Sequence, residues 1–193
     1  MQERQGPTTV VFTDGACLGN PGPGGWAWAV EGPQVPGAPS RAGSPSEARA
    51  WPEGPAEPYG EAPGEAGARP FASGAEVHTT NQRMEISAAA AAIAALRGRL
   101  CVVSDSTYVV NCFRQRWWEG WQRRGWRNSK GDPVANQDLW RPMVEEALRR
   151  EVRFRWVKGH GGDPMNELVD RLAREAAVSQ AGRSGWLQDG VAP

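Results

Sequence analysis

The order of the apolar segments constrains the fold of this chain most. Three strand-like segments come first, starting at Val10, Trp26 and about Phe71, and three strands in succession predict an antiparallel meander. Two later strand-like segments, residues 102–104 and 152–157, alternate with helical patterns, as parallel strands joined by crossovers do. We therefore expect one α/β domain, and 193 residues are enough to form it around a substantial core.

Two acidic residues follow predicted strands. Asp14 comes directly after the strand at residues 10–13 and precedes residues 15–25, a glycine-rich run that we expect to turn the chain. Glycines there let the backbone approach a large ligand closely. Asp105 ends the strand at residues 102–104, where a helix starts. Because a strand holds a side chain more rigidly than a loop, both acids are candidates for a functional site.

Two further acids lie on predicted helices. A Thr/Asn cap at residues 79–81 opens an alanine-rich helix, so that Glu85 falls in or just after its first turn. Asp163 and Pro164 form an N-cap and a first helical residue for the last helix, and Asp170 lies about two turns into it. The four acids thus occupy two strand ends and two helices.

A cluster of carboxylates needs a counter-charge. Two like charges about 4 Å apart repel by roughly 4 kcal/mol at an effective dielectric constant of 20, so a cluster requires protons, cationic partners or metal ions. Oxygen ligands favour Mg²⁺ or Mn²⁺ over Zn²⁺. A pair of such ions can bind the attacking and leaving oxygens of an in-line phosphoryl displacement.

Five blocks of this sequence closely resemble the type 1 ribonuclease H family, whose members cut the RNA strand of RNA/DNA hybrids. The resemblance implies a ribonuclease H-like fold, with a five-stranded mixed sheet flanked by helices. It also implies hydrolysis with two Mg²⁺ ions, or Mn²⁺ in their place, and products with 5′-phosphate and 3′-hydroxyl ends. The metal-binding acids would be Asp14, Glu85, Asp105 and Asp170. The blocks keep the family's order and lie at residues 14–25, 79–85, 105–109, 121–140 and 156–170.

A histidine completes the catalytic residues that the resemblance implies. His160 lies in a glycine-rich loop ten residues before Asp170, where the family has a histidine that assists proton transfer or the release of product and metal. A neutral imidazole that titrates near physiological pH suits either role. Without the resemblance, a solvent-exposed loop histidine of no function is the simpler interpretation.

The resemblance also implies contacts with both strands of the hybrid. Glu85, Asn20, Gln82 and Asn166 match positions that contact the RNA strand near the cut, where the 2′-hydroxyl distinguishes RNA from DNA. Thr80 matches a position that grips a phosphate of the DNA strand.

The net charge of zero hides a basic segment. Residues 31–75 carry six glutamates and three arginines, which leaves three net positive charges on the rest of the chain. Residues 114–130 hold six basic side chains and one acid, the local charge that a nucleic-acid surface would use. The candidates for substrate binding in this segment are Arg123, Arg124, Arg127 and Lys130 on phosphates, and Trp117 and Trp121 on sugars.

The tryptophans of this region allow a second interpretation. Two or three of Trp117, Trp121, Trp126 and Trp140 could be core residues that pack helices together. We expect Trp140 to be buried and Trp117 to be exposed, so both interpretations stay open.

Residues 33–69 have the composition of an insertion. Pro, Gly, Ala and Ser dominate them, and little apolar surface is available to offset the entropy of ordering the backbone. We expect a disordered insertion inside a catalytic domain that spans residues 8–178, followed by a flexible tail at residues 179–193.

Cysteine usage and the lack of long apolar runs indicate a cytoplasmic protein. The three cysteines are odd in number and lack the spacing of zinc ligands, so we interpret them as reduced thiols. We find no signal peptide and no apolar run of membrane-spanning length, and we expect a monomer without membrane contact.

Two other functions deserve comparison with hybrid cleavage. One is a catalytically weak module that only binds hybrids, and the presence of all four acids argues against it. The other is an integrase-like DNA strand-transfer domain, which we would not expect to share the tryptophan-rich basic segment.

Overall fold

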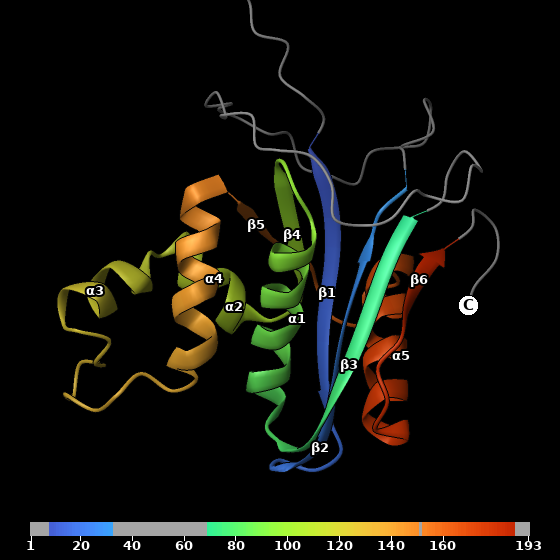
Figure 1. Cartoon of the computed structure of the whole chain (residues 1–193), viewed down its shortest axis with the longest axis horizontal. Coiled ribbons are helices and arrows are strands. Elements are labelled where there is room, and N and C mark those ends of the chain that lie inside the picture. The colour runs from blue at the N-terminus through green and yellow to red at the C-terminus, as the bar shows by residue number, and fades with distance from the viewer. Residues whose placement is uncertain (1–7, 33–68, 151, 188–193) are drawn as a thin grey trace, which may run out of the picture.

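The protein is a mixed sheet of six strands with helices on both faces (Figure 1). The computed structural model describes residues 8–32, 69–150 and 152–187. The strand order is β5-β4-β1-β2-β3-β6, with β4 and β5 parallel to β1 and the other pairs antiparallel. The strands are β1 (Thr9–Cys17), β2 (Gly22–Val30), β3 (Arg69–Thr79), β4 (Leu100–Ser104), β5 (Arg153–Trp156) and β6 (Ser184–Leu187). The helices are α1 (Asn81–Ala95), α2 (Thr107–Arg114), α3 (Trp117–Arg123), α4 (Gln137–Arg150) and α5 (Pro164–Ser179).

Alternating side chains of the central strands build two hydrophobic clusters. Val11 and Trp28 join the cluster under α1, α2 and α4, whereas Phe12 and Ala29 join the cluster under α5. This is the period of two expected for a strand that is covered on both faces. The α/β fold with a mixed sheet, predicted from the order of the segments, is confirmed.

The helix starts lie where their capping residues predict them. Thr80 is the N-cap of α1, and its side chain accepts a hydrogen bond from Arg83 N. Asp163 is the N-cap of α5, accepting from the backbone N–H groups of Met165 and Asn166, and Pro164 follows at the first helical position. The positions of Glu85 and Asp170 along their helices follow from these caps.

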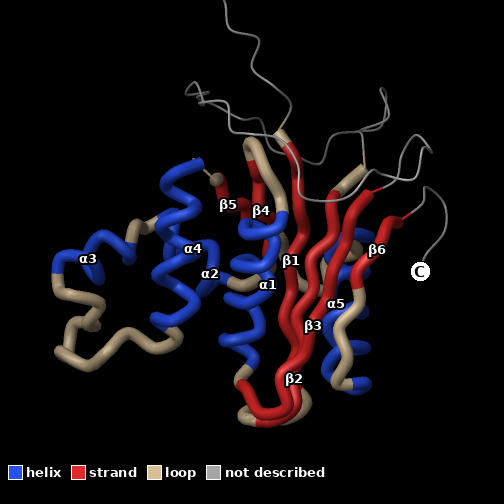
Figure 2. The backbone as a smooth tube through the Cα atoms, in the orientation of Figure 1, coloured by secondary structure: helices blue, strands red, loops and turns tan. Residues whose placement is uncertain are grey.

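The glycine-rich run after Asp14 is not one long turn, so that prediction was wrong. The two strands continue through it and pair as far as Cys17 with Gly24, which leaves only residues 18–21 to connect them. Figure 2 shows both strands continuing almost to this connection. Asp14 therefore lies within β1, opposite Ala27, and not at the mouth of a loop.

The chain after α5 also departs from the expectation of a flexible tail from residue 179. Residues 184–187 form β6, antiparallel to the start of β3, with Phe71 opposite Gly185. Leu187 is buried in the cluster that contains Phe71, and this burial explains the extra strand. The sheet thus has six strands where the resemblance implied five. The predicted insertion at residues 33–69 lies, except for Arg69 in β3, outside the described residues.

Candidate active site

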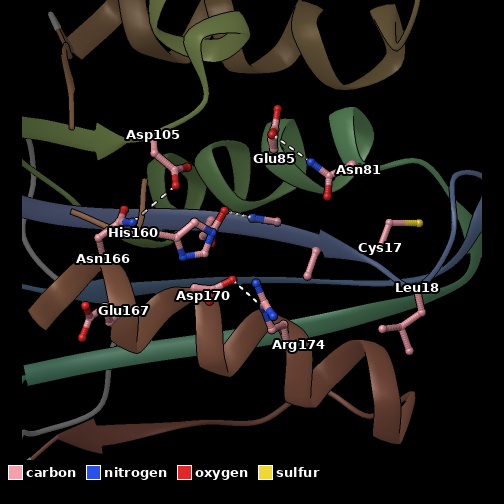
Figure 3. A pocket seen from close by; sticks show the side chains of 13 residues that line it. Cys17, Leu18, Asn81, Glu85, Asp105, His160, Asn166, Glu167, Asp170 and Arg174 are labelled. Atoms are coloured by element: carbon pink, nitrogen blue, oxygen red, sulfur yellow. Dashed lines mark hydrogen bonds and ion pairs between the residues drawn. The ribbon is translucent and has the colours of Figure 1, made fainter. Parts of the chain in front are cut away.

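Five carboxylates line one pocket: Glu167 of α5 and the four acids that the sequence analysis singled out. Asp14 comes from β1, Glu85 from α1, Asp105 from the residue after β4, and Asp170 from α5. His160 lines the same pocket, and Figure 3 shows its imidazole among the labelled acids. The structure thus brings together the acids and the histidine that the sequence singled out.

Three glycines let the elements that carry these acids come close to one another. A Cβ atom at Gly15 in β1 would collide with the backbone of α1. A Cβ atom at Gly25 in β2 would collide with the backbone of α5. A Cβ atom at Gly159 would lie 2.6 Å from Oδ2 of Asp105. These glycines are needed for close packing around the site. The sequence analysis had assigned Gly15 and Gly25 to a turn and did not predict this role.

Asp14 is the most enclosed of the four acids. Its side chain belongs to a residue that is 8% exposed, and its Oδ1 accepts a hydrogen bond of 2.7 Å from Gly15 N. The pKa of Asp14 is raised to about 8, first by burial and then by the carboxylate of Asp105, with smaller contributions from Asp170 and Glu85 and an opposing one from the Gly15 hydrogen bond. Without a cation, Asp14 therefore holds a proton at neutral pH.

Glu85 is held by two neutral donors. Asn81, one turn earlier on α1, donates from Nδ2 to Oε1 over 2.9 Å, and Ser106 donates from Oγ to Oε2 over 2.5 Å. Burial raises the pKa of Glu85, the Ser106 hydrogen bond opposes that shift, and the charge of Asp105 adds to it. Ser106 is also the N-cap of α2, so one hydroxyl ties the start of α2 to α1.

The other two acids have one side-chain partner each. Oδ2 of Asp105 accepts a hydrogen bond of 3.3 Å from Nδ2 of Asn166, which comes from α5. Oδ1 of Asp170 accepts one of 2.8 Å from Nε of Arg174, one turn later on α5. The backbone oxygen of Asp105 accepts a further hydrogen bond from the indole of Trp156.

The chemistry of the pocket fits a divalent cation. Among residues 8–32, 69–150 and 152–187, no group of three or more His, Cys, Asp or Glu side chains is already arranged to hold a metal ion. The carboxylates bind protein donors instead. Burial, and in addition the charge of neighbouring carboxylates, raise the pKa values of Asp14 and Glu85, and a divalent cation would relieve the repulsion between the acids. The carboxylates offer oxygen ligands, which suit Mg²⁺ or Mn²⁺.

Comparison with known proteins assigns the family. A family model described as RNase H matches residues 59–178. The chain belongs to the ribonuclease H family. Ribonuclease H of Syntrophomonas wolfei is 41% identical over 173 residues, which cover 88% of this chain and 96% of that protein. Ribonuclease H of Moorella thermoacetica is 43% identical over 172 residues, covering 88% and 91% respectively.

Solved structures agree with this family at the level of the fold. LC9-RNase H1, described as a type 1 RNase H with the type 2 active-site motif, superposes with a TM-score of 0.67 at 29% identity, covering 95% of this chain and 79% of its own. The N-terminal RNase H domain of rv2228c from Mycobacterium tuberculosis gives a TM-score of 0.56 at 20% identity, covering 90% and 95%. The latter likeness concerns the ribonuclease H fold alone.

The loop that carries His160 has an unusual backbone conformation. His160 itself has φ +51 and Gly162 has φ +77, both in the left-handed region that residues other than glycine seldom adopt. His160 is exposed and still lines the pocket, because this backbone directs its side chain over the carboxylates. A side chain so placed can exchange protons with both the site and the solvent.

The residues expected to contact the two strands of the hybrid divide into two groups. Asn166 lines the carboxylate pocket and is 3% exposed, and its Oδ1 is buried without a hydrogen-bond partner in the described part of the chain. Asn20, Thr80 and Gln82 lie instead at the start of α1. There Asn20 accepts a hydrogen bond from Asn81 N, Thr80 caps the helix, and Gln82 is exposed.

The basic segment forms a separate surface around α3, beyond α4 and away from the sheet (Figure 1). All six of its cations are exposed, and a shallow pocket there is lined by Trp117, Trp121, Arg123, Arg124 and their neighbours. They include the four that the sequence analysis named as candidates for phosphate contacts: Arg123, Arg124, Arg127 and Lys130.

The tryptophans in and next to this segment pack mainly into the hydrophobic core. The prediction of a buried Trp140 is confirmed, and that of an exposed Trp117 was wrong. Trp140 is fully buried, as expected, and Trp121 is 9% exposed. Trp117, expected to be exposed, is half-buried, because its ring packs on Tyr108 and Trp121 at centroid distances of 5.9 and 6.5 Å. Trp126 is also half-buried. A sugar could therefore meet the open part of Trp117 and only an edge of Trp121.

Three residues of the site escaped the sequence analysis. They are Asn81, Ser106 and Arg174, which bind the carboxylates of Glu85 and Asp170. Helical spacing was the available signal for two of them, because residues four apart on a helix lie on one face. Asn81 precedes Glu85 by four residues, and Arg174 follows Asp170 by four.

Proposed function

We propose that this chain is a metal-dependent endonuclease that hydrolyses the RNA strand of RNA/DNA hybrids, leaving 5′-phosphate and 3′-hydroxyl ends. The observation that carries the proposal is the convergence of four acids from β1, α1, the end of β4 and α5 on one pocket, in a chain of the ribonuclease H family.

Asp14, Glu85, Asp105 and Asp170 would hold the metal, which we propose to be a pair of Mg²⁺ ions with Mn²⁺ as an alternative. When bound, the ions supply charge neutralisation and activation of the attacking water. The protein's own contribution is to keep the carboxylates in place. Ser106 and Asn81 orient Glu85, and Gly15 N holds Asp14.

Two further side chains act on the reacting groups in this proposal. His160 carries protons between the pocket and the solvent or helps product to leave, as its exposed position over the carboxylates allows. Asn166 contacts the RNA strand in this proposal, since it lines the pocket beside Asp105. Asn20 and Gln82 extend this contact beside the start of α1, and Thr80 grips a phosphate of the DNA strand there.

The hybrid's phosphates would meet the exposed cations around α3, with Trp117 and the edge of Trp121 beside the sugars. This contact positions the substrate without reading its sequence. The cations are Arg123, Arg124, Arg127 and Lys130.

We also propose that the enzyme works in the cytoplasm as a monomer. All three cysteines are free thiols, as is usual where disulfides do not persist. Within the described residues, none of the helices has the length and apolarity needed to cross a membrane.

The decisive experiment is cleavage of an end-labelled RNA/DNA hybrid in Mg²⁺, with duplex DNA and duplex RNA as controls. We expect the RNA of the hybrid to be cut, duplex DNA to be spared, duplex RNA to be cut poorly, and excess chelator to stop the reaction.

Asp105→Asn should abolish cleavage while hybrid binding persists. Equal cutting of duplex DNA, or cleavage in excess chelator, would contradict the proposal, and hybrid binding by the wild type without cleavage would favour the binding module.

A further inference from the structure

The four pocket carboxylates that we propose as metal ligands are not held by the same kind of partner. Neutral donors hold three of them: a backbone N–H for Asp14, Asn81 and Ser106 for Glu85, and an amide for Asp105. Asp170 is instead paired with the guanidinium of Arg174, whose Nε lies 2.8 Å from Oδ1 of Asp170.

Arg174 belongs to the pocket itself. Its side chain lines the pocket with the acids, and Figure 3 shows it directed at Asp170. The hydrogen bond and charge of Asp170, and to a smaller degree the charge of Asp14, raise the pKa of Arg174. The guanidinium therefore interacts directly with Asp170, one of the acids proposed to hold metal.

We propose that Arg174 is a positioning residue that neutralises Asp170 in the metal-free protein and thereby weakens and tunes the binding of divalent cations. This inference rests on the proposed metal-dependent function. A carboxylate oxygen bound to a guanidinium must give up that partner, at least in part, before a metal ion can share it. The positive charge that remains nearby also repels the incoming ion.

The size of the effect follows from exposure. The Arg174 side chain is 58% exposed and that of Asp170 is 26% exposed, so solvent screens the pair and its strength is modest. We expect metal affinity to change by about three- to five-fold when the guanidinium is removed. By thermodynamic linkage, the loss of Arg174 must destabilise the metal-free state relative to the metal-bound state by the same factor.

A simple helix-stabilising pair is the competing explanation, since residues four apart on a helix often form ion pairs. The chain offers a matched control on the same helix. Arg171 and Glu175 have the same spacing, at 3.9 Å, and Arg171 does not line the carboxylate pocket. Arg171→Gln thus removes an arginine of α5 without touching the site.

The test is Mn²⁺ binding to the full-length, substrate-free protein, measured by the electron paramagnetic resonance signal of free Mn²⁺. We expect Arg174→Gln to bind Mn²⁺ about three- to five-fold more tightly than the wild type. Arg174→Lys, which keeps the charge, and Arg171→Gln should stay within about two-fold of it. In an Asp170→Asn background, Arg174→Gln should lose most of its effect, since the pair is already broken.

Thermal unfolding gives an independent readout. The rise in Tm from chelator to Mg²⁺ should be larger for Arg174→Gln than for the wild type. Unchanged or weaker Mn²⁺ binding by Arg174→Gln, beside normal binding by the wild type, would overturn the role of Arg174 and leave the proposed nuclease intact. A wild type that binds no Mn²⁺ in the pocket, and cleaves no hybrid, would overturn the proposed metal site and this inference together.

Discussion

At the scale of single residues, Asp14 couples the chemistry of the site to the stability of the fold. Its pKa rises from the ordinary value of 3.8 to about 8, first because it is buried and then because other carboxylates lie near it. Between these two pH values the folded protein binds a proton that the unfolded chain has lost. Its contribution to stability is therefore complete below about pH 4, falls as pH rises toward 8, and changes no further above that.

Asp14→Asn should remove this pH dependence, because the amide cannot ionise. In chelator at pH 8, we expect the variant to be more stable than the wild type by an amount on the order of 2 kcal/mol, while cleavage is abolished. The difference should shrink toward pH 5. Denaturant melts of both proteins at the two pH values measure it, and a constant difference across pH would show that Asp14 does not titrate as described.

A second prediction at this scale concerns substitution of Gly159, which lies against the carboxylate of Asp105. An alanine Cβ would lie 2.6 Å from Oδ2 of Asp105, so the loop or the carboxylate must shift. Because the loop is exposed, we expect Gly159→Ala to keep its Tm within a few degrees and to lower kcat by about ten- to hundred-fold. Steady-state cleavage kinetics beside thermal melts would test this, and wild-type kcat would show that Asp105 tolerates the displacement.

At the scale of elements, glycines in strands decide how closely helices can approach the sheet. Gly25 in β2 faces the backbone of α5, the helix that carries Asp170. At Gly185 in β6, by contrast, an added Cβ would meet only the ring of Phe71, at 3.2 Å. The two positions thus differ in what must move: a helix backbone in one case and the end of a side chain in the other.

Gly25→Ala should therefore destabilise the protein by about 1–3 kcal/mol and reduce cleavage, since α5 must move away from β2. Gly185→Ala, the matched control, should cost clearly less and leave cleavage near the wild-type level. Urea unfolding and hybrid cleavage of both variants are the measurements. Equal losses in the two variants would mean that α5 is not held by close contact at Gly25.

These elements also show what the sequence could and could not predict. Local rules correctly placed the starts of α1 and α5, because Thr80, Asp163 and Pro164 act on their own helices. The glycine-rich run was misread as a turn, because the need for glycine arises from α1 and α5, which come much later in the chain. β6 was missed for the same reason, since its partner β3 lies more than a hundred residues earlier.

The site was more predictable than the fold around it. Asp14, Glu85, Asp105 and Asp170 could be recognised from their place at two predicted strand ends and on two predicted helices, and from the family's sequence blocks. Their hydrogen-bond partners could not, because the sequence gives the spacing of a residue such as Arg174 but not the direction of its side chain.

At the scale of the whole molecule, the ends of β2 and β3 define a junction. Ala29 pairs with Phe71, so the two strands are neighbours where residues 33–68 leave and rejoin the described fold. Replacing residues 33–68 by a short glycine-containing turn should retain both folding and hybrid cleavage. Circular dichroism, thermal melts and the cleavage assay test this, and loss of folded protein would show that the segment is required.

The strand order has a consequence for self-association. The outermost strands of the described sheet, β5 and β6, are only four residues long, and β6 pairs with no more than residues 69–72 of β3. Unpaired backbone groups at a long, flat edge invite another chain to add itself to the sheet, and short edges with charged side chains such as Arg153 and Arg155 discourage this. The architecture that assembles the carboxylates therefore also limits edge-to-edge aggregation at high protein concentration.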